Sequence, residues 1–219
     1  MNNLPSSSSL NQQQLREQLQ NGIAELPLTL PETAIAQLLQ YLALLHKWNR
    51  AYNLTAVRDP AEMVSRHLLD SLAVAPYVHG DHCADVGTGA GLPGIPLAIA
   101  LPQKQFTLID SNGKKIRFIA QAIAELGLKN VKAIQCRIES MQPEQAYDVV
   151  LSRAFATLAD MAQGCEQVVA TQGVMLAMKG VYPQQELSEL PERFKVAACH
   201  ALKVPNEAGQ RHLIEIRIG

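Results

Sequence analysis

Ten residues in the middle of the chain combine one acid with a high density of glycines. In the run Asp85-Val86-Gly87-Thr88-Gly89-Ala90-Gly91-Leu92-Pro93-Gly94, three glycines alternate with other residues shortly after Asp85. Glycine has no Cβ, so it adopts positive φ and lets the backbone lie directly against a ligand. A bend of this kind is suited to binding a flat molecule at close range.

The flanking residues predict a strand before this bend and a helix after it. Residues 82–86 are short and mostly apolar, as in a buried strand, and proline is tolerated in the first turn of the helix expected over 93–101. The spacing Gly89-x-Gly91-x-x-Gly94 also satisfies the dinucleotide pattern, in which a helix N-terminus receives a pyrophosphate. A nicotinamide-dependent oxidoreductase is therefore one interpretation, and an ordinary glycine-rich loop is another.

Asp85 favours a cationic ligand over a nucleotide diphosphate. At the end of the first strand its carboxylate would repel a pyrophosphate and attract an ammonium group. S-adenosylmethionine carries an α-amino group and a sulfonium but no phosphate, so it fits this arrangement better.

A second acid, Asp110, ends the strand expected over residues 105–110, roughly 20 residues beyond the glycines. That separation places a carboxylate at the tip of the adjacent strand, within reach of ribose hydroxyls. The alternative role for Asp110 is to cap the helix expected over residues 112–126. A nicotinamide enzyme would carry the same acid.

The loop after the third expected strand, residues 131–135, holds Ile138 and Glu139. In a sheet of this kind that loop borders an adenine, so Ile138 would pack on the base. Glu139 would either add a polar contact or cap the next turn.

The fourth and fifth expected strands end in cationic side chains at the same edge. The strand that begins at Tyr147 breaks into a loop containing Arg153, and the strand expected over 173–179 ends at Lys179. Ligands of open α/β sheets gather outside the carboxyl ends of the strands. Arg153 would therefore face a phosphate, the substrate or a cofactor carboxylate.

Strands alternate with helices from about residue 82, which predicts a mostly parallel sheet with helices on both faces, an α/β domain over residues 80–219. The two last strand candidates, 195–204 and 211–218, flank a turn and predict a hairpin, so the last strand is expected to be antiparallel to a neighbour.

The residues before this domain are predicted to be a serine-rich flexible tail over 1–10 and a helical extension over 11–79, packed on the main domain. An apolar face at three- and four-residue spacing marks a helix that begins near Pro31. Asp59-Pro60 begins a further helix, expected through about Ala75.

Three cations, Lys114, Lys115 and Arg117, lie in the first turns of the helix expected over 112–126. Cations at this end of a helix oppose the macrodipole. They are candidates for contacts with RNA phosphates, with a solvated helix face as the alternative.

Polar residues of the helical extension present a similar choice. Asn49, Arg66 and His67, with the stretch Trp48 to Thr55, would form a polar rim over the ligand cleft, or else cap helices and pack. Spacing alone favours the second interpretation, because aromatic residues at helical spacing usually pack.

Composition limits the class of protein. The chain has 219 residues, 47% of them hydrophobic, enough for one sizeable core, and its formal net charge of −1 means that RNA binding would need local basic patches. Its four cysteines form no C-x-x-C pair, so reduced thiols and no metal site are expected. Neither a signal peptide nor a membrane span is recognised, which predicts a soluble, cytoplasmic protein.

The combined motifs resemble those of the class I S-adenosylmethionine-dependent methyltransferases: Asp85-x-Gly87-x-Gly89-x-Gly91, Asp110 and the closing hairpin. More specifically, the chain from about residue 30 onward resembles the bacterial small-subunit ribosomal RNA guanine-N7 methyltransferases, the glucose-inhibited division protein B family. This likeness is carried by His46-Lys47-Trp48-Asn49, Tyr52-Asn53-Leu54-Thr55, Arg66-His67-Leu68-Leu69-Asp70-Ser71, Gly87 to Pro96 and Ser152-Arg153-Ala154-Phe155.

The resemblance implies a Rossmann-like fold with seven strands, and methylation of N7 of one guanine in the 530 loop of 16S ribosomal RNA. The partner would be the small ribosomal subunit or an assembly intermediate, and we expect a monomer. With the residues above, the expected cofactor contacts are Asp85, Gly87, Gly89, Gly91, Leu92, Asp110, Ile138, Glu139 and Arg153. The resemblance also strengthens the expectation that RNA is contacted by Asn49, Arg66 and His67, beside the candidates Lys114, Lys115 and Arg117.

This chemistry needs no general base, because guanine N7 has a free lone pair and no proton. Catalysis would come from orientation, which supplies several kcal/mol of barrier reduction. We therefore expect Arg153 and Lys179 to position RNA or cofactor. Two other functions stay open at this point: a NAD-dependent oxidoreductase, and a non-catalytic ribosome-binding protein that senses the cofactor.

Overall fold

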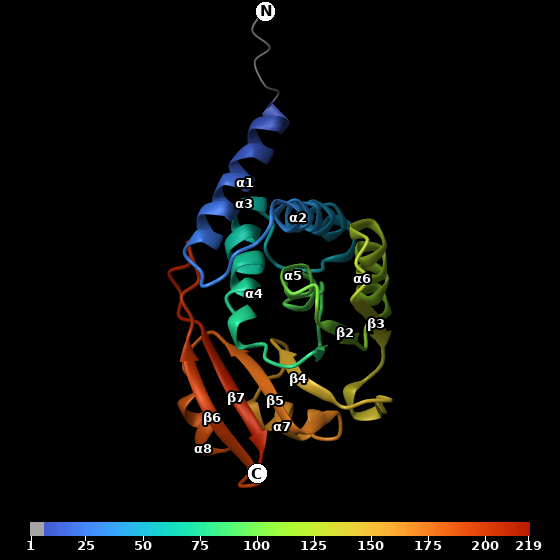
Figure 1. Cartoon of the computed structure of the whole chain (residues 1–219), viewed down its shortest axis with the longest axis vertical. Coiled ribbons are helices and arrows are strands. Elements are labelled where there is room, and N and C mark those ends of the chain that lie inside the picture. Colours follow the sequence, from blue (N-terminus) through green and yellow to red (C-terminus); the bar gives the residue numbers. More distant parts are fainter. Residues whose placement is uncertain (1–6) are drawn as a thin grey trace, which may run out of the picture.

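The computed structural model describes residues 7–219, with side chains from residue 11 onward, and its centre is a seven-stranded sheet (Figure 1). The strand order is β3-β2-β1-β4-β5-β7-β6. The strands are β1 (His82–Val86), β2 (Gln105–Asp110), β3 (Val131–Gln135), β4 (Tyr147–Ser152), β5 (Val169–Lys179), β6 (Phe194–Ala201) and β7 (His212–Ile218).

Strands β1 to β5 pair in parallel, whereas β7 is antiparallel to both β5 and β6. The predicted mostly parallel sheet with an antiparallel last strand is therefore confirmed. The strand order reverses between β1 and β4, and the carboxyl edge at such a switch point is where open α/β sheets bind ligands.

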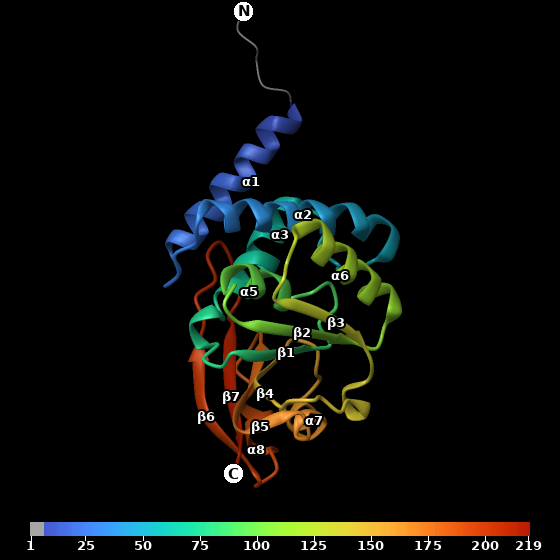
Figure 2. The ribbon, with the colours of Figure 1, turned by 45° about the vertical axis from the view of Figure 1, so that its right-hand side comes forward.

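Helices cover both faces of the sheet, as Figure 2 shows for α5 and α6 on one side and α7 on the other. Successive residues of a strand point to opposite faces, so Cys83 joins the hydrophobic cluster under α5 and α6, and Ala84 joins the cluster under α7. The helices that follow the strands are α5 (Gly94–Ala100), α6 (Gly113–Leu126), α7 (Leu158–Cys165) and α8 (Gln184–Ser188).

The N-terminal helices pack on the first of these faces. Helix α1 (Ser7–Ala24) extends beyond the rest of the molecule in Figure 1, and α2 (Glu32–Tyr52) lies against α6, where the amide of Gln37 donates to the Leu126 carbonyl. Because α1 begins at Ser7, the last four residues of the predicted tail belong to a helix. Residues 1–6 of that tail lie outside the described residues.

The single helix predicted from Pro60 to about Ala75 is interrupted. It consists of α3 (Pro60–Met63), a π-helical segment (Val64–Leu69) and α4 (Asp70–Leu72), and the Asp70 N–H donates to the Ser65 carbonyl five residues back. Apart from Arg66, every residue from Met63 to Ala75 is buried. Because almost all of these side chains are buried, the spacing of apolar and polar residues does not show where the π turn adds one residue to the helix.

Boundaries in the second half also differ from the prediction. Helix α7 ends at Cys165, and β5 begins at Val169 instead of Gly173. β-branched residues pack well in strands, and Val168 and Val169 are both buried. The short helix α8 was not predicted. Within residues 7–219, no helix has the length and hydropathy to cross a membrane.

Candidate functional site

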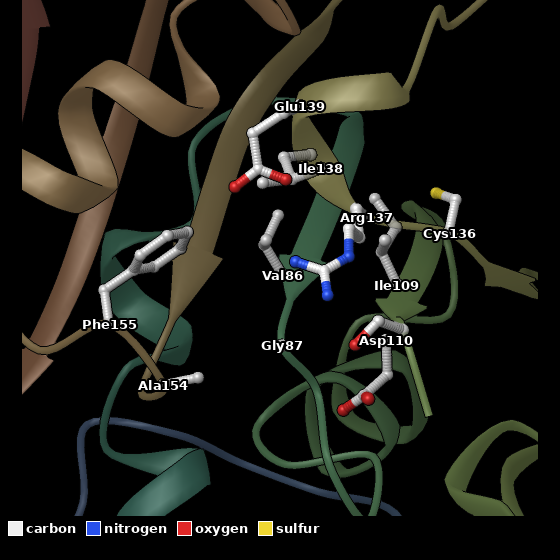
Figure 3. Close-up of a pocket in the computed structure, with 11 residues that line it drawn as sticks. Val86, Gly87, Ile109, Asp110, Cys136, Arg137, Ile138, Glu139, Ala154 and Phe155 are labelled. Atoms are coloured by element: carbon white, nitrogen blue, oxygen red, sulfur yellow. The ribbon is translucent and has the colours of Figure 1, made fainter. Parts of the chain in front are cut away.

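The carboxyl edge at the switch point is hollowed where β1, β2, β3 and β4 end (Figure 3). We call this cavity the strand-end hollow. It is lined by Val86, Gly87, Ile109, Asp110, Ser111, Cys136, Arg137, Ile138, Glu139, Ala154 and Phe155. Four of the nine predicted cofactor contacts are among these residues: Gly87, Asp110, Ile138 and Glu139.

The glycine bend forms one wall of the hollow. Gly87, Gly89 and Gly91 all have positive φ, at 66°, 63° and 87°. A Cβ on Gly87 would lie 2.5 Å from the Cβ of Ala154, whereas the nearest atom to a Cβ on Gly89 would be 3.9 Å away. Gly87 is therefore needed both for its conformation and for the close approach of the β4 loop.

Asp85 lies beneath the bend and does not line the hollow. Its side chain is fully buried, and Oδ2 accepts hydrogen bonds from the Thr88 hydroxyl at 2.6 Å and the Gly94 N–H at 2.8 Å. Oδ1 is buried and has no hydrogen-bond partner among the described residues. Burial raises the pKa of Asp85 to about 6, against the lowering effect of those two hydrogen bonds. The Asp85 carboxylate thus stabilises the bend through Oδ2, and within the described part of the chain Oδ1 is left as a free hydrogen-bond acceptor.

Asp110 lines the hollow and is tied to the bend. Oδ2 accepts the Gly89 N–H at 3.0 Å and lies 3.3 Å from the Lys115 ammonium, while Oδ1 accepts the Asn112 N–H at 2.8 Å. The side chain that caps α6 is Asn112, which accepts from the Lys114 N–H. The alternative role of helix cap therefore belongs to Asn112, and Asp110 faces the hollow.

The loop after β3 closes the opposite wall with a 3-10 turn, Ile138–Ser140. Ile138 is buried, its carbonyl accepts from the Gln167 amide, and the Glu139 carboxylate points toward the hollow in Figure 3. The Arg137 guanidinium also extends into the hollow, and Phe155 stands across from it. Arg137 was missed, because nothing in the sequence distinguishes it from a loop cation.

Arg153 does not line the strand-end hollow, and its contact with the cofactor stays a prediction. Its Nη1 donates to Asp70 Oδ2 at 3.0 Å, and Arg211 Nε donates to Asp70 Oδ1 at 3.0 Å. Asp70 thereby joins the helical extension to the loop after β4 and to the residue before β7. Sequence reasoning gave Asp70 and Arg211 no role, because their pairing is tertiary.

The Asp70 cluster lines a second cavity, which we call the basic pocket. It brings together Arg153 and Lys179, as predicted, with Arg66 and His67. The complete lining is Val57, Arg66, His67, Asp70, Arg153, Met178, Lys179, Gly180, Leu202, Arg211 and His212. The Lys179 ammonium lies 2.8 Å from Glu186 and donates to the Ala156 carbonyl at 3.1 Å.

His67 is an uncharged member of the basic pocket near neutral pH. Its ring nitrogens lie 2.8 Å from the Thr55 hydroxyl and 2.9 Å from the Arg66 carbonyl oxygen. Burial, followed by the positive charge of Arg153, lowers the pKa of His67 to about 4. The cationic surface of the pocket is therefore supplied by arginine and lysine.

The other residues that were predicted to contact the cofactor or RNA lie in different parts of the molecule. Asn49 is buried, its amide donates to the Val57 carbonyl and accepts the Thr55 N–H, so the prediction that it contacts RNA is not supported. Lys115 is paired with Asp110, which makes it part of the hollow's support. Besides Asp85 and Arg153, three of the predicted cofactor contacts do not line the hollow: Gly89, Gly91 and Leu92. Two of the predicted RNA contacts, Lys114 and Arg117, are exposed on α6.

Comparisons with known proteins agree with this architecture. A chain from Alteromonas mediterranea, "Ribosomal RNA small subunit methyltransferase G", is 50% identical over 206 residues, covering 94% of this chain and 98% of that protein. The protein of the same name from Pseudomonas aeruginosa strain LESB58 is 53% identical over 202 residues, covering 92% and 94%. Neither the oxidoreductase nor the non-catalytic binding protein is supported by these matches.

The fold is shared more widely. The glycopeptide N-methyltransferase MtfA, solved with S-adenosyl-L-homocysteine, aligns with a TM-score of 0.60 at 9% identity, over 70% of this chain and 87% of that one. A family model described as rRNA small subunit methyltransferase G matches residues 34–214. A seven-stranded methyltransferase sheet, a ligand hollow at its switch point and these matches lead to one conclusion: the chain belongs to the GidB family, rRNA small subunit methyltransferase G.

Proposed function

We propose that this protein transfers a methyl group from S-adenosylmethionine to N7 of a single guanine in the 530 loop of 16S ribosomal RNA. One observation carries the proposal: the strand-end hollow and the basic pocket lie on either side of the short loop Arg153-Ala154, within a chain of the small-subunit rRNA methyltransferase family. A methyl donor and an anionic nucleic acid would meet there.

The residues of the hollow fit S-adenosylmethionine. Asp110 has a lone pair left on Oδ1 for a ribose hydroxyl, since that oxygen accepts one hydrogen bond. Ile138 offers an apolar surface to an adenine, and the absent side chain of Gly87 leaves room for the backbone to approach the ligand. The unpartnered oxygen of Asp85 is an acceptor for an ammonium group, directly or through a water molecule.

When bound, S-adenosylmethionine supplies an electrophilic methyl group on a positively charged sulfur. The protein's task is to hold that group in line with guanine N7, and orientation of this kind can lower a barrier by several kcal/mol. The bend from Gly87 to Gly91 and the paired carboxylate of Asp110 would fix the donor. No side chain needs to remove a proton, which agrees with both ring nitrogens of His67 being hydrogen-bonded within the protein.

Arg153 and Lys179 would act as positioning residues on the RNA side of the loop. Both line the basic pocket and both are held by carboxylates, Arg153 by Asp70 and Lys179 by Glu186. The formal net charge of −1 places this cationic surface in an otherwise neutral protein, which favours a folded ribonucleoprotein as the partner over naked RNA. The small subunit or its assembly intermediate, a monomeric enzyme and a cytoplasmic location complete the proposal.

The test is methyl transfer to small subunits isolated from a strain that lacks the enzyme. We expect label from S-adenosylmethionine to enter 16S ribosomal RNA, at one guanine of the 530 loop, as N7-methylguanosine. Label found in ribosomal protein, on another base or at many guanines would contradict the proposal. A Gly87→Ala variant serves as the inactive control, because its added methyl group closes the hollow against Ala154.

A further inference from the structure

The basic pocket is shaped and charged for part of a nucleic acid backbone. Its volume is about 340 Å³, and it is lined by four permanently cationic side chains and one carboxylate, Asp70. Asp70 is shared between Arg153 and Arg211, and three carboxylates outside the lining, Glu62, Glu186 and Glu207, pair with Arg66, Lys179 and Arg211. These pairs balance the charge of the pocket, so an anion is attracted by the guanidinium N–H groups that the pairs leave free.

The donors of the pocket are not all used within the protein. Among the described residues, Arg153 is hydrogen-bonded through Nη1 alone, which leaves Nε and Nη2 free. The Arg66 side chain is 48% exposed and lies 3.5 Å from Glu62, a distance typical of a weak surface pair. A phosphate can thus bind to these guanidinium groups without breaking the Asp70 bridge.

An exposed aromatic side chain stands at the rim of the same pocket. The loop after Lys179 carries Val181 and Tyr182, which are 75% and 42% exposed, and both are large hydrophobic residues. The Tyr182 ring meets the ring of His212, a pocket residue, edge-on at 5.5 Å. His212 is itself tethered, with Nδ1 3.3 Å from the Gly180 carbonyl oxygen. The aromatic ring is therefore held next to the cationic surface.

Basic grooves with neighbouring aromatic rings bind unpaired RNA, since the cations bind phosphates and the rings stack on bases. We propose that the basic pocket binds a backbone phosphate next to the target guanine, through Arg66 and Arg153, and that Tyr182 stacks on an unpaired base that flanks the target. This inference rests on the proposed function and identifies the substrate as an unpaired segment of the RNA. An RNA duplex does not fit, because its bases are stacked on one another.

Tyr182 gives the first test, with binding and methylation measured separately. Small subunits from the strain that lacks the enzyme are titrated with the protein in the presence of S-adenosylhomocysteine, and their Kd is measured. Tyr182→Ala should raise Kd roughly ten-fold, Tyr182→Phe should keep the wild-type value, and the neighbouring Val181→Ala serves as the matched control. Affinity for S-adenosylmethionine should stay unchanged in all three variants.

Arg66 gives the second test. Replacing Arg66 by Gln should weaken binding and lower the slope of log Kd against log salt concentration by roughly 0.7 to 1, the value for one phosphate contact. Equal Kd values for wild type and Tyr182→Ala, or an unchanged salt slope in Arg66→Gln, would overturn the inference. A wild-type protein that methylates no guanine N7 would instead overturn the proposed function, since the binding series does not depend on methyl transfer.

Discussion

The strand-end hollow and the basic pocket are built in opposite ways. The hollow is formed by the tips of adjacent parallel strands, and backbone geometry and two acids define it. The basic pocket is formed by long cationic side chains from the π-helical segment, the loop after β4, the end of β5 and the residue before β7. The strand-end hollow therefore depends on local chain conformation, and the basic pocket depends on how distant segments pack.

This difference explains what the sequence predicted. The hollow was anticipated through Gly87, Asp110, Ile138 and Glu139, because a strand followed by a bend places its residues at the sheet edge whatever the rest of the chain does. The bridge from Asp70 to Arg211 spans 141 residues and left no local pattern. The same reason explains why the partners of Asn49 and Arg153, which are Val57 and Asp70, were not visible in the sequence.

The largest effect on the hollow is expected from Gly87→Ala. Its new methyl group would lie 2.5 Å from the Ala154 Cβ, and affinity for S-adenosylmethionine, measured by calorimetry, should fall at least 100-fold, on the order of 3 kcal/mol. Gly127→Ala is the control, since Gly127 has nearly the same φ but no neighbour within 4 Å of an added Cβ. Gly127→Ala should lower the unfolding free energy by about 1–2 kcal/mol and leave affinity intact. Equal loss of affinity in both variants would show that backbone strain, and not the clash, controls the hollow.

A smaller loss is expected from Asp110→Asn. A hydrogen bond to a charged group contributes about 1.5–3 kcal/mol, so affinity for S-adenosylmethionine should fall about ten- to one-hundred-fold. Asp148→Asn is the matched control, because the Asp148 carboxylate also accepts hydrogen bonds from two backbone N–H groups. These belong to Asp81 and His82, at the opposite edge of the sheet. That control should bind the cofactor normally. An unaffected Asp110→Asn variant would remove the ribose contact from the proposal.

The basic pocket is tested by Asp70→Asn. Loss of the charge shared by Arg153 and Arg211 should lower the unfolding free energy by about 1–3 kcal/mol and release both side chains. We expect kcat/KM for small subunits to fall about ten-fold while cofactor affinity is kept, as assayed by radiolabel transfer and calorimetry. Glu207→Gln, which removes the more distant partner of Arg211 at 3.4 Å, should have little effect. A loss of cofactor affinity in Asp70→Asn would mean that the two sites are not separable.

The smallest effect concerns pH. Since folding raises the pKa of Asp85 from 3.8 to about 6, the native state binds the proton more tightly, and the contribution of Asp85 to stability falls as pH rises from about 4 to 6. A cationic ligand reverses this preference, because it favours the carboxylate. Affinity for S-adenosylmethionine should therefore increase up to about ten-fold between pH 5 and 7. Asp85→Asn should abolish that increase, and a pH-independent wild type would argue against an ammonium group near Asp85.

The π-helical segment Val64–Leu69 allows the helix that carries Asp70 to lose one residue and still present Asp70 to its partners. A π turn accommodates one residue more than an α turn in about the same rotation of the chain. An in-frame deletion of a single codon here would restore an uninterrupted α-helix and leave Asp70 in nearly its present orientation relative to the residues before the deletion. The bridge to Arg153 and Arg211 would then be kept in a chain that is one residue shorter.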